Sequence, residues 1–331
     1  MEKQRRKTSQ IIIEELQERS KECQGFVRST FRSERIEDPE LRKALEHYFS
    51  YWNDFTHPGL FSFSFEAAGG RLDKALKPQA AIAMIAAGFD IHDDIIDGSQ
   101  EKQNHQTVFG KYGQNLSLLL GNAFMINGLT LLELSISDLP VERFRKITET
   151  AKKCLFEVGN AHALELPLRG ITAVSPQKYF EIIEMKAASV EADMHIAGLI
   201  ASDRSEVSEA LREYGRILGT LATLREEFVD VFEVAELNRR LRKEALPIPI
   251  AFALKDADLK ERILKKLKKR ELTKTDVDAL VELVFRSESI SALKSKMEKL
   301  CIRAEVLAEK LETQKYKTVF RELARSTLED L

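Results

Sequence analysis

Apolar residues recur along this chain mostly at spacings of three and four, and no other feature constrains its fold as much. Leu41, Leu45 and Tyr48 show this spacing in the first part of the chain, and Leu211 and Tyr214 show it again further on. Residues spaced in this way share one face of a helix. The sequence has no strand-like alternation and no Asn-Gly or Asp-Gly turn between alternating runs, which are the usual signs of hairpins. We therefore expect an all-α fold.

The candidate helices follow one another without a linker. Gly and Pro, which interrupt helices, number only 15 and 8, and the segments between them run for roughly 15–30 residues. Since no stretch of biased composition divides the chain, we predict a single domain over residues 1–331. Three segments, 80–91, 116–132 and 187–200, are apolar almost all round. Helices of that kind suit the centre of a large bundle.

Charge and cysteine usage exclude several classes of function. Lys and Arg number 51 and Asp and Glu 53, so the net charge is −2 and there is no basic footprint for nucleic acid. The three cysteines lie far apart, which favours a reducing, cytoplasmic location over a disulfide framework or a zinc site. The basic amino end has no apolar signal-peptide core. Segment 116–132 contains Asn122 and Asn127 and is shorter than the ~20 residues of a membrane span, so we expect a buried helix there.

Two acidic clusters share one spacing and are the candidate metal-binding residues. They are Asp93, Asp94 and Asp97, and Glu226, Glu227 and Asp230. At positions i, i+1 and i+4 of a helix, three carboxylates project to one side. Because like charges repel and an unpaired buried charge is costly, a cation should lie among them. Carboxylate oxygens suit Mg²⁺, which keeps positions for waters and phosphates. The second cluster also has a plainer interpretation, a solvated charge run beside Arg225.

Further short motifs accompany the two clusters at consistent spacing. They are Tyr112-Gly113, Leu119-Leu120-Gly121-Asn122, His162-Ala163-Leu164-Glu165-Leu166, Lys186-Ala187-Ala188 and Lys243-Glu244-Ala245-Leu246-Pro247. Together with the segments 91–97 and 226–230, these motifs resemble in order and spacing those of the trans-isoprenyl diphosphate synthases, the polyprenyl synthetase family. The resemblance is clearest over residues 52–254.

This resemblance implies an isoprenoid-synthase-type helical bundle around a central cavity, across which the two acidic motifs face each other. Magnesium ions held by the six acids would bind the diphosphate of an allylic prenyl substrate. The lysines that could complete this clamp are Lys102, Lys186 and Lys243, and Arg225 and Arg240 are weaker candidates. The expected catalytic residues are Asp93, Asp94 and Lys186. In the family, bulk one turn before the first motif limits the prenyl tail, so Phe89 would cap the pocket and Gly88 would open it.

The family's site for isopentenyl diphosphate is altered in this sequence. Relative to the family's GGKRxRP loop, Asp54 replaces a lysine, and Phe55 and His57 replace arginines. Lys102 keeps the cation that contacts the allylic diphosphate, whereas Gln103 replaces the arginine that contacts isopentenyl diphosphate. A diphosphate needs several charge-assisted partners. We therefore expect the allylic half of the site to be retained and the isopentenyl half to be dismantled.

These features predict a magnesium-dependent prenyltransferase. It would ionise an allylic prenyl diphosphate and transfer the prenyl group to an acceptor that is not necessarily isopentenyl diphosphate. Two alternatives share the fold: a terpene synthase, which quenches the cation within its own chain or with water, and a non-catalytic subunit of an active synthase. Isopentenyl diphosphate bound through His57 would restore ordinary chain elongation. We expect a cytoplasmic homodimer, or a heteromer with an active synthase, and the acceptor and chain length stay open.

Overall fold

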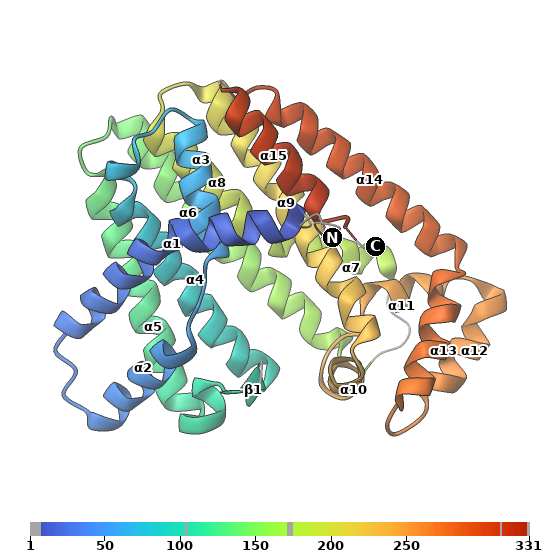
Figure 1. The fold of residues 1–331 in the computed structure, drawn as a ribbon. Helices are drawn as coiled ribbons and strands as arrows, with labels where there is room; N and C mark the ends of the chain where they lie inside the picture. The colour runs from blue at the N-terminus through green and yellow to red at the C-terminus, as the bar shows by residue number, and fades with distance from the viewer. Residues whose placement is uncertain (1–7, 103–104, 171–174, 312, 330–331) are drawn as a thin grey trace, which may run out of the picture. The chain divides into compact units, whose positions relative to one another are not determined.

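The computed structural model describes residues 8–102, 105–170, 175–311 and 313–329, which are almost entirely α-helical (Figure 1). The longer helices are α1 (Thr8–Ser33), α2 (Pro39–Tyr51), α3 (Thr56–Ala67), α4 (Leu76–Asp97), α5 (Val108–Ile136), α6 (Val141–Glu165), α7 (Pro176–Lys186), α8 (Ala188–Ala201), α9 (Ser205–Phe232), α10 (Val234–Lys243), α12 (Ala257–Leu267), α13 (Lys274–Phe285), α14 (Glu288–Ala308) and α15 (Gln314–Ser326). The short elements are α11 (Ile248–Ala253), the 3₁₀ turns η1 (Leu72–Lys74) and η2 (Leu166–Leu168), and the strands β1 (Glu101–Lys102) and β2 (His105–Gln106). The all-α prediction is confirmed.

The chain divides into two compact units. The first comprises the described parts of Met1–Lys152, Ala192–Arg212 and Lys310–Lys317, and the second those of Lys153–Glu191, Glu213–Glu309 and Thr318–Leu331. Four boundaries between the units fall inside the described helices α6, α8, α9 and α15. A single domain over residues 1–331 remains a prediction.

The first unit is built on the close packing of α4 against α5, with α1 and α3 also against α4 and α2 against α5 (Figure 1). Glycines permit this approach: a Cβ placed on Gly128 of α5 would lie 2.8 Å from the Ala81 carbonyl oxygen of α4. An aromatic cluster fills the space beside the two helices, and the Phe31 and Phe124 ring centroids lie 4.1 Å apart within it. This buried cluster holds the carboxyl half of α4 in place.

The end of α4 determines where the first acidic motif lies. Gly98 adopts a left-handed conformation (φ 64°), and the Ser99 amide donates to the Asp94 carbonyl oxygen at 2.9 Å. This is a helix stop that glycine favours. It leaves Asp93, Asp94 and Asp97 in the last turns of α4. The chain then forms the β1–β2 hairpin, in which Lys102 pairs with His105.

The second unit places the other acidic motif at the carboxyl end of α9. Phe228 of α9 is fully buried, with its ring centroid 5.9 Å from that of Phe285 in α13. The Tyr214 hydroxyl donates to the Phe320 carbonyl oxygen at 2.5 Å and ties α9 to α15. Glu233 adopts an extended conformation and separates α9 from α10, so the basic run in α10 follows the motif on a separate helix.

The structure corrects one expectation about α5. Segment 116–132 is helical as predicted, but it is not buried all round. Ile126 is 64% exposed, and Leu119 and Leu134 are exposed as well. By length and composition alone, α5 could cross a membrane, with 33% of its most apolar window buried. The reason for the difference is that α5 packs one face against α4 and α2, whereas its apolar composition extends round the helix.

Candidate functional site

Lys102 lies among the carboxylates of the first acidic motif. Its Nζ is 2.7 Å from Asp94 Oδ1, 3.1 Å from Asp90 Oδ1 and 4.0 Å from Asp93 Oδ2. Asp94 is 2% exposed, whereas Asp93, Asp97 and Lys102 are partly exposed. The sequence predicted a cation among these acids, and in this structure the hairpin supplies it.

Burial governs the electrostatics of this motif. It raises the pKa of Asp94 to about 7, against the opposing charge of Lys102, and Asp90 adds to the rise. Burial lowers the pKa of Lys102, but the charges of Asp90 and Asp94 outweigh it and the pKa is raised. A buried carboxylate whose charge is this poorly solvated favours the arrival of further positive charge.

The donor set of the first motif fits a magnesium ion. Asp93, Asp94 and Asp97 offer the hard oxygens that magnesium prefers, and Asp93 and Asp97 can be reached from solvent. Within the described ranges no three acidic, histidine or cysteine side chains are already grouped as a metal site. The cation that lies beside Asp94 in this structure is the Lys102 ammonium, which is carried on a flexible stem with 37% of its side chain exposed.

Asp54 and His57, two residues that the resemblance predicts to be altered, belong to a separate polar group at the start of α3. Asp54 Oδ1 accepts from the amides of Thr56 (2.9 Å) and His57 (3.3 Å). Asp54 Oδ2 is buried without a hydrogen-bond partner among the described residues. His57 Nδ1 lies 2.5 Å from Asp193 Oδ2 of α8, and Asp193 is 5% exposed. Gln103 lies outside the described residues.

His57 is thus a cation whose charge is already balanced. Burial lowers its pKa, but the Asp193 carboxylate outweighs burial, and with help from Asp54 and Asp90 the pKa rises to about 9. Burial raises the pKa of Asp193 and of Asp54. Two carboxylates therefore surround one imidazolium. Asp193 was not predicted, because sequence reasoning treated segment 187–200 as apolar almost all round.

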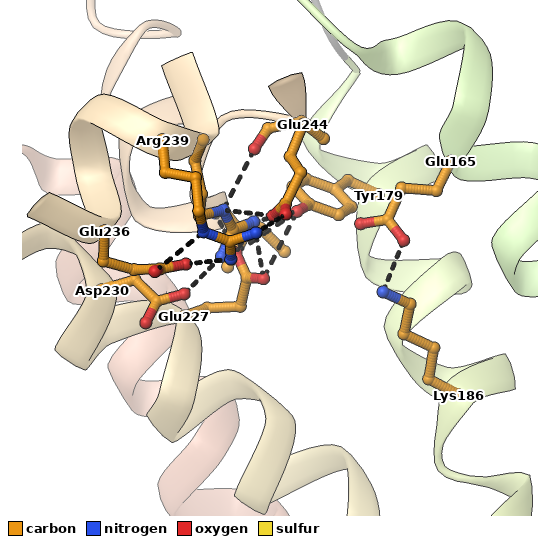
Figure 2. A network of polar contacts seen from close by, with 11 residues as sticks. Glu165, Tyr179, Lys186, Glu227, Asp230, Glu236, Arg239 and Glu244 are labelled. Atoms are coloured by element: carbon orange, nitrogen blue, oxygen red, sulfur yellow. Dashed lines mark hydrogen bonds and ion pairs between the residues drawn. The ribbon is translucent and has the colours of Figure 1, made fainter. Parts of the chain in front are cut away.

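Arg240 of α10 occupies the second acidic motif. Its Nη1 donates to Asp230 Oδ2 at 2.6 Å, its Nη2 lies 2.8 Å from Glu227 Oε1, and Nη2 also donates to the Tyr179 hydroxyl at 2.7 Å. Its Nε donates to the Ala245 carbonyl oxygen at 3.2 Å. Figure 2 shows Glu227, Asp230 and Tyr179 turned toward one another in this network. Glu226 of α9 is exposed to solvent.

The remaining predicted residues lie as follows. Lys186 ends α7, and its Nζ is 2.5 Å from Glu165 Oε2 (Figure 2). Lys243 ends α10 and is exposed. Phe89 is half-buried on α4, and Gly88 faces Met125 of α5, whose Cγ would lie 2.5 Å from an added Cβ. Sequence reasoning rated Arg240 below Lys243. The three-residue spacing from buried Leu237 was the signal that Arg240 points inward.

Comparisons with known proteins agree with this architecture. The family model described as Polyprenyl synthetase matches residues 38–284. A geranylgeranyl diphosphate synthase of Sulfolobus acidocaldarius is 22% identical over 254 residues, covering 74% of this chain and 77% of that protein. A geranylfarnesyl diphosphate synthase of Methanosarcina mazei is 24% identical over 214 residues, covering 64% and 70%.

Solved structures extend the similarity of fold to almost the whole chain. A geranylgeranyl pyrophosphate synthetase from Pyrococcus horikoshii superimposes with a TM-score of 0.82 at 22% identity, covering 97% of this chain and 99% of that one. A decaprenyl diphosphate synthase from Rhodobacter capsulatus gives 0.79 at 18% identity, covering 97% and 98%. The resemblance noted in the sequence is confirmed, and the chain belongs to the polyprenyl synthetase family, a family of prenyltransferases.

Proposed function

We propose that this polyprenyl synthetase ionises an allylic prenyl diphosphate at the first acidic motif and transfers the prenyl group to an acceptor. The carbon–oxygen bond breaks, its electron pair leaves with the diphosphate, and an acceptor nucleophile attacks the allylic cation. Magnesium bound by Asp93, Asp94 and Asp97 would stabilise negative charge on the leaving group. The observation that carries the proposal is the ammonium of Lys102 beside buried Asp94, where it can donate charge-assisted hydrogen bonds to a diphosphate.

Three further residues belong to the proposal. Lys186 and Lys243 would contact a substrate diphosphate. Lys186 forms an ion pair with Glu165. The charge of Lys186 outweighs the effect of burial and lowers the pKa of Glu165, so the lysine ammonium has a fixed position. Phe89, one turn before Asp93 on α4, would limit the length of the prenyl tail.

The proposed acceptor is not isopentenyl diphosphate. His57 is the cation that could have replaced the family's arginines, and Asp193 balances its charge at 2.5 Å. Asp54 adds a second buried carboxylate next to it. Each lost charge-assisted contact costs about 1.5–3 kcal/mol, so two losses weaken binding by roughly two to four powers of ten. The carboxylates of Asp54 and Asp193 would not repel a neutral or cationic acceptor.

Incubation with geranyl, farnesyl and geranylgeranyl diphosphates, with and without isopentenyl diphosphate, tests the function. We expect little turnover of an allylic diphosphate alone and no elongated product at micromolar isopentenyl diphosphate. Rapid conversion of the lone substrate to a cyclic product would indicate a terpene synthase instead. An inert protein that binds no allylic diphosphate would indicate a non-catalytic subunit.

Calorimetric titration tests the acceptor site directly. A non-hydrolysable allylic diphosphate analogue should bind with magnesium, and isopentenyl diphosphate should bind far more weakly. Asp193→Asn combined with His57→Arg should tighten isopentenyl diphosphate binding by about tenfold, because arginine stays charged without a carboxylate partner. Asp203→Asn, at an exposed position just after α8, is the matched control. Micromolar binding by the unmodified protein would contradict the proposed acceptor specificity.

We also propose that residues 1–331 form a single domain. Support comes from helices α6, α8, α9 and α15, which each continue from one unit into the other, and from a solved synthetase that covers 97% of the chain. The exposed apolar side chains of α5 support a homodimer. We place the protein in the cytoplasm, as the separated cysteines predict.

A further inference from the structure

We propose that Arg240 is the permanent counter-cation of the second acidic motif, so that Glu227 and Asp230 bind this guanidinium instead of a metal ion. Metal binding then depends on the first motif alone. The inference rests on the proposed function for diphosphate binding and revises the role predicted for Glu227 and Asp230. The inference predicts which acids of the two motifs bind metal ions, and therefore how many metal ions bind.

The guanidinium is fully engaged. Arg240 is 5% exposed, and all three of its nitrogens have partners: Nε the Ala245 carbonyl, Nη1 Asp230, and Nη2 both Glu227 and the Tyr179 hydroxyl. Burial lowers the pKa of Arg240, but Glu227, Tyr179 and Asp230 outweigh it, so the side chain stays charged. A planar guanidinium fixed on several sides cannot swing away as a lysine can.

Glu227 is equally committed. It is 7% exposed, and its Oε2 accepts from the Ile248 amide at 2.8 Å as well as from Arg240. Tyr179 approaches the same carboxylate at 3.3 Å. A metal ion that took Glu227 and Asp230 would leave a buried guanidinium without its counter-charges, and breaking a buried pair in this way is strongly unfavourable. A metal site that includes Glu227 and Asp230 therefore does not fit the second motif.

The first motif differs in the exposure of its resident cation and of Asp93. Its resident cation, Lys102, is 37% exposed at the side chain and comes from a two-residue strand. Asp93 is 31% exposed at the side chain, and its Oδ2 is 4.0 Å from the ammonium. Lys102 can therefore be exchanged for a metal ion, whereas Arg240 cannot.

Counting bound Mn²⁺ by electron paramagnetic resonance, on the full chain with pyrophosphate, tests the inference. We expect Asp93→Asn to weaken Mn²⁺ binding by about tenfold or more and Asp230→Asn to change it by less than about threefold. Arg240→Gln should create an additional Mn²⁺ site, and Arg240→Gln combined with Asp230→Asn should remove it again. Arg239→Gln is the matched control, because Arg239 is the neighbouring residue and pairs with Glu236 and Glu244.

The possible outcomes separate this inference from the proposed function. If Asp230→Asn weakens Mn²⁺ binding as much as Asp93→Asn does, the second motif is a metal site and the inference is wrong. If the unmodified protein binds no Mn²⁺ with pyrophosphate, the proposed function fails, and the gain of a site in Arg240→Gln still decides the role of Arg240. Should Arg240→Gln not fold by circular dichroism, Glu227→Gln with Arg240 retained replaces it, and unchanged Mn²⁺ binding is expected.

Discussion

The ion pair between His57 and Asp193 makes the stability of this chain depend on pH. The pKa of His57 is about 9 in the folded chain, above the ~6.5 of an unfolded histidine. Its stabilising contribution is therefore complete below about pH 6.5 and is lost as the pH rises through about 9. We expect the free energy of unfolding to fall by about 2–3 kcal/mol over this range relative to His57→Gln.

Urea unfolding between pH 6 and pH 10 measures this loss. Asp193→Asn removes the same pair, so its pH profile should match that of His57→Gln. Parallel profiles for the unmodified protein and His57→Gln would mean that the pair contributes no pH-dependent stability.

At the same scale, sequence reasoning found the acids but only one of their partners. The like charges of Asp93, Asp94 and Asp97 require a cation, and Lys102 was already a candidate for their neighbourhood. Asp193 could not be paired with His57 in advance, because the two residues meet only when α8 lies beside the start of α3. Tyr179 was missed for the same reason. The roles of Glu227 and Asp230 depend on Arg240, which sequence reasoning ranked only as a weaker candidate.

At the scale of helices, the contact between α4 and α5 depends on glycine. An added Cβ at Gly128 would lie 2.8 Å from the Ala81 carbonyl oxygen and 3.0 Å from the Ile85 amide nitrogen. Backbone atoms cannot move aside as a side chain can, so Gly128→Ala should destabilise the protein by about 1–3 kcal/mol. The measurement is the free energy of unfolding in urea.

Gly159 of α6 is the matched control, because an added Cβ there meets nothing within 4 Å. Gly159→Ala should stabilise the protein by about 0.5–1 kcal/mol through helix propensity. Equal effects of the two substitutions would mean that the α4–α5 contact is not tight at Gly128.

Helix positions were largely predictable, whereas exposure was not. The three- and four-residue spacing of apolar residues gave the all-α class, and Gly98, one of the glycines that separate the candidate helices, ends α4. The apolar composition of α5 indicated burial on all sides. Which face of such a helix meets a neighbour within the same chain depends on packing, and Ile126 and Leu134 are exposed here.

For the whole molecule, these exposed residues predict the state of assembly. If α5 forms the surface between two copies, the unmodified protein should sediment at about twice the chain mass of 37.7 kDa. Ile126→Lys and Leu134→Lys should shift it to the monomer, because a buried lysine at an interface is poorly tolerated. Ile302→Lys, at a similarly exposed position of α14, should leave assembly unchanged. A monomeric unmodified protein would contradict the proposed homodimer.

The position of Lys102 has a consequence for how the substrate arrives. Because its ammonium already pairs with Asp94 and Asp90, a metal–diphosphate complex meets carboxylates whose charge is partly compensated. It exchanges one cation for another, and the released ammonium can turn to the incoming anion. Long-range attraction between solvent-exposed charges is what salt screens. Substrate capture by this site should therefore vary less with ionic strength than it would if Lys102 were absent.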